Sequence, residues 1–337
     1  MASALGQIGG AAQAPAGLRP AAPLRWGEMA RPIVALAPMD GITDSAYRQV
    51  VRCIDPGVVL FSEFTCADGF LRSEKVRRRL DFQVEEHPYF VQLFGNNPLA
   101  FSEASRALEQ LGVAGIDINM GCPAKKIVSS QHGSGLMRDV NLACRVVEAV
   151  ASACRLEVSV KTRLGWGDDS RLISFTRSLV EAGASLITIH GRTYDQGFSG
   201  AADWEPIFRL KEHLPVPVLG NGDLRDVRDG LAKVGPLDGF MIGRAAIGNP
   251  WAFLPEGRDY RPDLPERVEV IREHYRLMRA VKPARLALIE FRKHLVGYLR
   301  KFDHAKTARL ALLTAPDEGA FLRLLDELGQ RPLALAS

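Results

Sequence analysis

Two apolar runs, GIDINMG (115–121) and EVSVKTRL (157–164), decide the fold of this chain because a segment with helical spacing lies between them. Each run is rich in Ile, Val or Leu, ends in polar or glycine residues, and has the length of a buried strand. A strand, a helix and a second strand in this order are typical of a parallel βαβ unit.

Six further runs extend this pattern on both sides: IVALAPM (33–39), VVLFSEF (58–64), YFVQLFG (89–95), LITIHGR (186–192), PVPVLGNG (215–222) and GFMIGRA (239–245). Eight βα units over about 230 residues predict an α/β fold, a (β/α)8 TIM barrel. A doubly wound open sheet is the alternative. That fold should carry G-x-G-x-x-G after its first strand, where this chain has PMDGITD.

The sequence also predicts three regions. Residues 1–24 are rich in Ala, Gly and Pro with Arg19 as their only charge, so we expect a flexible tail and not a signal peptide. The barrel is expected over 25–256, the linker PEGRDYRPDLPER over 255–267, and a small helical domain over 264–337. Within the barrel, helices are expected at Pro98 to Leu111 and at Asp169 to Ala182, with Asp169 as the N-cap of the second.

The composition excludes several classes of protein. Of 337 residues, 47% are hydrophobic and 24% charged, as in a globular protein, and no apolar run is long enough to span a membrane. The five cysteines contain no C-x-x-C pair, which argues against a disulfide scaffold, a zinc site or an iron–sulfur cluster. We therefore expect a cytoplasmic protein with no structural metal and no membrane partner.

In a barrel of this kind the chemistry lies at the carboxyl ends of the strands, so the residues that end each run form the candidate site. They are Pro38, Met39, Asp40, Glu63, Gln92, Asn119, Cys122, Lys161, Arg163, His190, Arg192, Asn221, Gly222, Asp223, Gly243 and Arg244. One histidine and few carboxylates are a poor ligand set for zinc or iron, which favours an organic cofactor. The glycines of GNGD (220–223) and IGRAAIGNPW (242–251), with Arg244, favour a phosphate-bearing one.

Lys161 lies in an otherwise apolar strand and should point into the mouth of the barrel. It could form a Schiff base in an aldolase or donate to the N1/O2 edge of a reduced flavin. The structural alternative is a salt bridge to Glu63 or another barrel carboxylate.

Cys122, beside Pro123 and two lysines, lies in an electropositive loop that favours a reactive thiol. Cys66 is its rival. Cys53, Cys144 and Cys154 fall in helical segments and are expected to be core residues.

Seven of the eight strand ends carry motifs that together resemble the tRNA-dihydrouridine synthases. They are APMDGITD (37–44), VQLFGN (91–96), DINMGCPAKK (117–126), VKTRLGW (160–166), TIHGRT (188–193), GNGD (220–223) and MIGRAAIGNPW (241–251). NMGCPAKK and RKHLVGYL (292–299) are most similar to the bacterial B-type branch. The resemblance spans about residues 30 to 310.

The resemblance implies an FMN enzyme that reduces the C5=C6 bond of specific tRNA uridines with NADPH as reductant. It implies that Pro38 and Met39 lie against the isoalloxazine, and that Gln92, Lys161 and His190 bond its polar edge. Asn221, Gly222, Asp223, Gly243 and Arg244 would surround the phosphate. Asn119 would face the uracil, and Cys122 would be the general acid toward C5.

One loop departs from the family pattern. Where the family usually has an Asn and a Lys or Arg between CPAKK and GSG, this chain has Val128, Ser129 and Ser130. The departure affects contacts to the substrate nucleotide and leaves the modified tRNA position open.

Positive charge is concentrated in the helical segment. Residues 266 to 309 carry twelve Lys or Arg and five acids, a net +7 in a chain whose net charge is +4. Such a surface is suited to a phosphate backbone, and we expect Arg163, Arg285, Arg292, Lys293 and His294 to contact tRNA. In 285–302 a stripe of Leu288, Phe291, Leu295 and Leu299 should pack inward. Arg300 and Lys301 should then also stay free to face RNA. A second basic run, 72–79, follows the second strand.

Other functions remain open at this stage. A flavin-dependent dehydrogenase of a free pyrimidine, of the dihydroorotate or dihydropyrimidine type, also carries a Cys-Pro pair after an Asn on a barrel loop. The +7 segment favours the RNA substrate over a free base. An RNA-binding protein without turnover and a Schiff-base aldolase are further alternatives. We expect a monomer.

Overall fold

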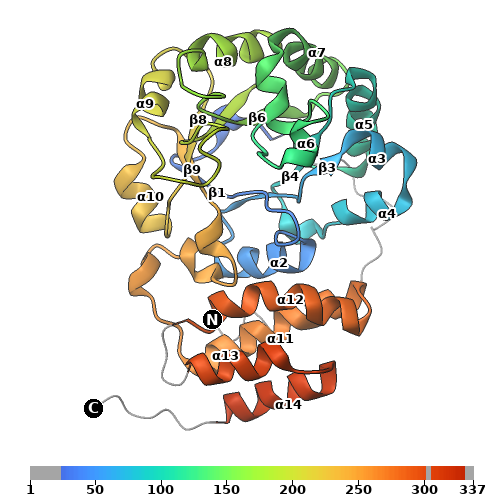
Figure 1. Cartoon of the computed structure of the whole chain (residues 1–337), viewed down its shortest axis with the longest axis vertical. Coiled ribbons are helices and arrows are strands. Elements are labelled where there is room, and N and C mark those ends of the chain that lie inside the picture. Colours follow the sequence, from blue (N-terminus) through green and yellow to red (C-terminus); the bar gives the residue numbers. More distant parts are fainter. Residues whose placement is uncertain (1–23, 301–304, 331–337) are drawn as a thin grey trace.

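Nine short parallel strands form a single sheet in the computed structural model, which describes residues 24–300 and 305–330 (Figure 1). The strands are β1 (Ile33–Leu36), β2 (Val59–Phe61), β3 (Thr65–Cys66), β4 (Tyr89–Phe94), β5 (Gly115–Asn119), β6 (Glu157–Arg163), β7 (Leu186–His190), β8 (Val218–Asn221) and β9 (Gly239–Ile242). All eight predicted strands are present. β3 is a two-residue addition that the sequence pattern did not predict.

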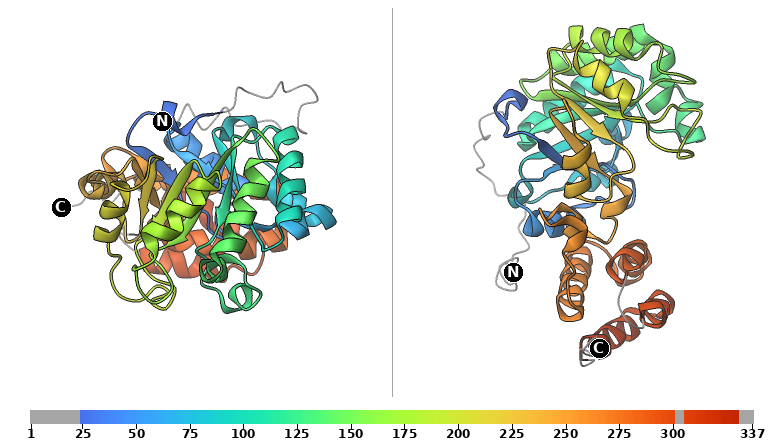
Figure 2. Two further views of the ribbon diagram at one scale, coloured as in Figure 1. Left: turned by 90° about the horizontal axis from the view of Figure 1, so that it is seen from above. Right: turned by 90° about the vertical axis from the view of Figure 1, so that its left-hand side faces the viewer.

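The sheet closes into a barrel because β1 pairs with strands on both of its sides. Ala35 aligns with Val59 of β2, and Val34 aligns with Phe240 of β9. β2 pairs in turn with β4, and β3 pairs with the same edge of β4 farther along, so β3 continues the position of β2 and adds no ninth place to the ring. The predicted eight-stranded TIM barrel is therefore confirmed (Figure 2).

Helices surround the barrel. They are α2 (Ser45–Ile54), α3 (Ala67–Arg72), α4 (Glu74–Arg77), α5 (Pro98–Leu111), α6 (Lys125–Val128), α7 (Val140–Ala151), α8 (Leu172–Glu181), α9 (Glu205–Lys211) and α10 (Val227–Lys233). α5 has the predicted bounds, because Asn97 caps the N–H of Leu99 and Pro98 occupies the first turn.

The predicted start of α8 was wrong. The helix begins at Leu172, and the Asp169 side chain instead binds Arg209 at 2.8 Å. The reason is local, since Asp168 accepts bonds from the backbone N–H and the hydroxyl of Ser170, and this turn precedes the helix.

The barrel has two apolar layers. A large core fills the space between strands and helices, and a second core of Ala35, Phe61, Phe90 and Met241 lies inside the ring. Trp26, which is 1% exposed, stacks on Phe90 with ring centroids 4.4 Å apart. The interior is therefore a packed core, as is typical of this fold.

The described part of the C-terminal segment forms four helices that pack beneath α2 (Figure 1). They are α11 (Leu264–Val281), α12 (Ala284–Tyr298), α13 (Ala305–Thr314) and α14 (Glu318–Gly329). The predicted linker was too long, because Asp263 caps α11 through the N–H of Glu266 and residues 264–267 already belong to the helix. Residues 1–23 of the predicted tail lie outside the described residues.

The helical segment and the barrel share an interface of apolar and polar contacts. Val50 and Ile54 of α2 belong to the same core as Phe291 and Leu295 of α12. The Tyr47 ring of α2 lies against His274 of α11 and His294 of α12, with ring centroids 5.3 and 4.7 Å apart. Lys282 bonds Asp44 at 2.6 Å and Glu290 at 2.7 Å.

Two kinds of feature are absent from the described residues. None of the helices found there has both the length and the apolar character that crossing a membrane requires. The same residues contain no group of three or more His, Cys, Asp or Glu side chains placed to hold a metal ion.

The closest backbone approach at this interface predicts a stability effect. A Cβ at Gly297 would overlap the carbonyl oxygen of Ile247 and the backbone of Gly248. We expect Gly297→Ala to lower the free energy of unfolding by about 1–3 kcal/mol, the usual cost of overpacking. Denaturant unfolding measures it, with Val296→Ala, at a 40% exposed position, as control. Equal stability of the two variants would contradict the prediction.

Candidate functional site

The candidate site lies at the carboxyl ends of the barrel strands. Neighbouring strands bring predicted residues side by side, since Asn119 aligns with Lys161, Arg163 with His190, and His190 with Asn221. Pro38 and Met39 follow β1, and Gly243 and Arg244 follow β9, the strand on the other side of β1. Ring closure therefore gathers the predicted strand ends around one opening.

A chain of buried side chains runs beneath this opening. Asp117 accepts bonds from Gln92 Nε2 and from Ser159 Oγ, both at 2.6 Å. Gln92 Oε1 accepts from Asn119 Nδ2 at 2.8 Å. Asn119 Oδ1 then accepts from the backbone N–H groups of Gly121 (3.1 Å) and Cys122 (2.9 Å).

The orientation of each amide in this chain is determined by the one before it. A carboxylate only accepts, so Gln92 must turn its NH2 toward Asp117 and its oxygen toward Asn119. Asn119 must then turn its own oxygen toward the loop that carries Cys122. Burial raises the pKa of Asp117 to about 6, and the bonds from Gln92 and Ser159 oppose this effect.

Two of the predicted site residues belong to this buried chain. Gln92 is 0% exposed, and both ends of its amide are bonded within the protein. Asn119 is 7% exposed, and its side chain holds the loop of Cys122. The expected contacts of Gln92 with the cofactor and of Asn119 with the uracil stay predictions.

Lys161 is half-buried at the opening and bonds an amide oxygen. Its Nζ donates to Asn221 Oδ1 at 3.1 Å, and Asn221 Nδ2 donates to the carbonyl of Met241. The alternative salt bridge to Glu63 is not formed, because Glu63 accepts from the N–H of Gly41 and from Arg79. Burial, together with Arg163, lowers the pKa of Lys161 to about 8.

Positive charge dominates the opening. Burial lowers the pKa of His190 to about 2, with further contributions from Lys161, Arg163, Arg192 and Arg244, so its imidazole is neutral. Arg192 bonds Asp223 through both carboxylate oxygens, at 2.8 and 2.6 Å, and Arg244 bonds it at 3.0 Å. The carboxylate of Asp223 offsets part of this charge.

Gly222 allows the backbone to pass close to His190. It has φ +127°, and a Cβ there would lie 2.7 Å from the Cβ of Ala202 and 3.1 Å from His190 Cδ2. At Gly243 a Cβ would meet only ordinary contacts, so that glycine is not required by crowding within the chain.

Cys122 is half-buried on the loop after β5. Its N–H bonds Asn119, and its carbonyl accepts from the N–H of Ser134 at 3.2 Å. Burial is the largest effect on its thiol and raises the pKa, so the thiol is protonated at neutral pH. Its predicted rival Cys66 lies in β3 and is also half-buried.

The other three cysteines were expected in helices and in the core. Cys53 and Cys144 lie in α2 and α7, whereas Cys154 lies in the turn after α7. All three are free and half-buried, not fully enclosed.

Sequence reasoning missed Phe198, in the loop after β7. Its ring is 59% exposed and lies 5.6 Å from the Arg163 guanidinium and 5.5 Å from that of Arg244. Arg163 itself is 2% exposed and donates to the carbonyls of Gly121, Thr193 and Gly197. An aromatic residue between glycines, in GFSG, was the available signal.

On α12, the predicted stripe of Leu288, Phe291, Leu295 and Leu299 is buried, as expected. Arg285 and Lys293 are exposed, and Lys293 donates to the carbonyl of Gly41 at 3.2 Å. Arg292 donates to the carbonyl of Ala315. His294 is 2% exposed against Tyr47 and His274, so its expected contact with RNA was wrong. Arg300 is exposed, and Lys301 lies outside the described residues.

The second basic run is largely paired. Arg72 and Arg78 bond acids one turn earlier in their own segments, and Arg79 binds Asp40 and Glu63. Arg77 donates to the carbonyls of Phe70 and Leu71.

Comparison with known proteins gives a consistent result. The family model described as Dihydrouridine synthase (Dus) matches residues 35–329. "tRNA-dihydrouridine synthase B" of Pseudomonas aeruginosa is 34% identical over 285 residues, 81% of this chain and 86% of that protein. "Probable tRNA-dihydrouridine synthase 1" of Synechocystis sp. is 33% identical over 286 residues, 82% of this chain and 80% of that protein.

Among solved structures, an old yellow enzyme homologue from Zymomonas mobilis has a TM-score of 0.47 at 15% identity. It covers 68% of this chain and 89% of its own.

The buried amide chain predicts a change in thiol reactivity. Asn119→Ala removes the acceptor of two loop N–H groups, so we expect iodoacetamide to alkylate Cys122 about five- to tenfold faster. Peptide mass spectrometry resolves the five free cysteines, with Cys66 as internal reference. Ser159→Ala, which perturbs only the far end of the chain, should change the rate less than about twofold. An unchanged rate in Asn119→Ala would show that the Ser134 contact holds the loop.

Proposed function

Because the chain belongs to the dihydrouridine synthase family, we propose that it is a cytoplasmic, monomeric enzyme that reduces specific uridines of tRNA to dihydrouridine. FMN would be the flavin and NADPH the reductant. The observation that carries the proposal is the half-buried thiol of Cys122 on the rim of an opening lined by cations, with the family match spanning residues 35–329.

The residues at the opening fit a phosphorylated flavin. Lys161 is a half-buried ammonium that, within the described residues, bonds a neutral amide and no carboxylate, and an anionic ring edge would stabilise it. Arg244 is exposed, and at the neighbouring Gly243 a Cβ would meet only ordinary contacts, so the backbone there is open to a ligand. Together these residues give one cationic centre for the ring edge and another for the phosphate at separate points of one rim.

Each residue then has a role in holding the flavin. Lys161 and neutral His190 would face its polar edge, and Pro38 and Met39, both partly exposed, would lie against the ring. Asn221, Gly222, Asp223, Gly243 and Arg244 would surround the phosphate, with Asp223 orienting both arginines. A bound reduced flavin supplies the hydride for C6 of the uracil.

Cys122 would supply the proton for C5. Its raised pKa keeps hydrogen on Sγ at neutral pH, as a general acid requires. Asn119, through the N–H of Cys122, fixes where that proton is held. After transfer, the cations Lys161 and Arg163 would stabilise the thiolate until solvent reprotonates it.

The tRNA would lie across the opening and the exposed cations of the helical segment. Arg285, Lys293 and Arg300 are exposed there, and Lys293 touches Gly41, two residues from Met39. A uracil stacked in tRNA cannot enter a barrel mouth, so the nucleotide must be extruded. Phe198, exposed beside Arg163, offers such a base an aromatic contact.

Removal of the thiol tests the chemistry. Cys122→Ala should keep flavin and tRNA binding but lower dihydrouridine formation about 10²–10⁴-fold, the usual contribution of a general acid. Anaerobically reduced protein is mixed with tRNA lacking dihydrouridine, and the product is measured by mass spectrometry. Cys66→Ala is the control. Full activity of Cys122→Ala would refute the role, and reoxidation by orotate but not tRNA would favour a free-pyrimidine enzyme.

Charge reversal tests the RNA surface. Arg285→Glu with Lys293→Glu should weaken tRNA binding and reduce the slope of log K against log salt, by about one unit for each lost phosphate contact. Fluorescence anisotropy at several salt concentrations measures this. Arg145→Glu, an exposed position on α7, is the control and should leave the slope unchanged. An unchanged slope in the double variant would locate the RNA elsewhere.

A further inference from the structure

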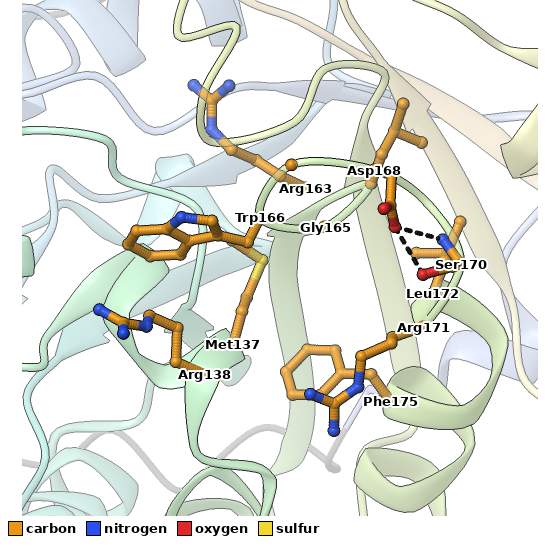
Figure 3. A pocket seen from close by; sticks show the side chains of 12 residues that line it. Met137, Arg138, Arg163, Gly165, Trp166, Asp168, Ser170, Arg171, Leu172 and Phe175 are labelled. Carbon is orange, nitrogen blue, oxygen red and sulfur yellow. Dashed lines mark hydrogen bonds between the residues drawn. The ribbon is translucent and has the colours of Figure 1, made fainter.

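A cavity of about 360 Å³ lies beside the opening, and of its lining residues only Arg163 has a role above (Figure 3). It is bounded by the turn Gly133–Arg138 after the Cys122 loop, by the loop after β6, and by the start of α8. Arg163 links it to the opening, because Arg163 lines the cavity and donates to Gly121 in the Cys122 loop.

Three arginines line this cavity, and two of them lack a carboxylate partner. Arg138 and Arg171 make no ion pair and no side-chain hydrogen bond within residues 24–300 and 305–330. Asp168, the acid in the lining, has its carboxylate bonded to Ser170. The cavity therefore carries excess positive charge with free guanidinium donors, which favours an anionic ligand.

The same cavity has flat, apolar surfaces. The Arg138 guanidinium lies 4.9 Å from the Trp166 ring, and Tyr194 stacks on that indole at 3.9 Å. Figure 3 shows Trp166 and Arg138 on one side of the cavity and Phe175 with Arg171 on another. Planar guanidinium and indole groups stack on a base, and guanidinium donors match a phosphate bidentately.

The cavity is remote from the exposed cations of the helical segment. In Figure 1, α7 and α8 lie at the end of the barrel opposite α12. An RNA docked on α12 would approach the opening from the α12 side. The cavity is then available to a smaller ligand whose other end reaches the opening.

We propose that this cavity binds the adenosine 2′-phosphate end of the reducing dinucleotide, with its nicotinamide end at the opening. The inference rests on the proposed function, because that function requires a nicotinamide reductant. The adenine would stack on the outer face of the Arg138 guanidinium, which lies over Trp166, and Arg171 would bind the 2′-phosphate together with the Arg138 N–H groups. The site selects a phosphorylated dinucleotide, since the unphosphorylated one offers these arginines no terminal dianion.

Binding of adenosine phosphates tests the site without turnover. Trp166 is half-buried, whereas Trp26, Trp204 and Trp251 are buried, so its fluorescence should report the ligand. We expect adenosine 2′,5′-bisphosphate to quench the Trp166 fluorescence saturably. It should bind at least about tenfold tighter than adenosine 5′-diphosphate, because its 2′-phosphate adds at least one charge-assisted hydrogen bond. Trp166→Phe should abolish the signal.

Variants identify the phosphate ligands. Arg138→Ala with Arg171→Ala should weaken binding of the bisphosphate at least about tenfold and remove the preference over the diphosphate. Arg177→Ala, exposed on the same helix α8, should change neither. Equal binding of both nucleotides, or no effect of the double variant, would overturn the proposal. Weaker tRNA binding in the double variant with unchanged nucleotide binding would also overturn it, and would assign the cavity to RNA.

The proposed function can be judged separately in the same variants. Chemically reduced protein needs no dinucleotide, so the double variant should still form dihydrouridine on tRNA at the unmodified rate. Loss of product in the unmodified chain would refute the function, whereas product without selective nucleotide binding would refute only this inference.

Discussion

The pairing of β1 with β2 on one side and β9 on the other is the interaction on which the rest of the structure depends. All strands are parallel, so this closure brings their carboxyl ends onto one rim. Met39 from the first strand and Arg244 from the last then face the same opening as Lys161 from the opposite part of the ring. An open sheet would have left these groups at two separate edges.

The rim has an electrostatic character that the barrel alone does not explain. Lys161, Arg163, Arg192 and Arg244 all lower the pKa of His190, and Asp223 bonds two of these four cations. Placing like charges together costs free energy unless an anion offsets it. The thiol of Cys122 shows the opposite effect, because burial raises its pKa in spite of the cations. One opening thus favours both a bound anion and a protonated thiol.

Local chemistry determined which features were predictable from sequence. The strands and α5 could be predicted, because apolar runs and the pair Asn97–Pro98 act within a few residues. The start of α8 could not, since the Asp168–Ser170 turn competes with the helix for the same backbone. The buried amide chain needs the register across three strands, where Gln92 aligns with Asp117 and Asp117 with Ser159. Sequence spacing alone does not contain that register.

His294 shows why the charge of a segment does not equal the charge it presents to a partner. The stripe on α12 was predicted correctly, but α12 packs against α11 and also against the loop at Gly248, which encloses His294 as well. Arg272, Arg276, Arg279 and Lys282 are likewise paired with acids. Of the cations on α12, Lys293 combines exposure with a bond to Gly41, next to the residues that follow β1. Lys293 therefore brings one exposed cation of the helical segment next to the rim of the barrel, and a polyanion bound at the rim would meet it there.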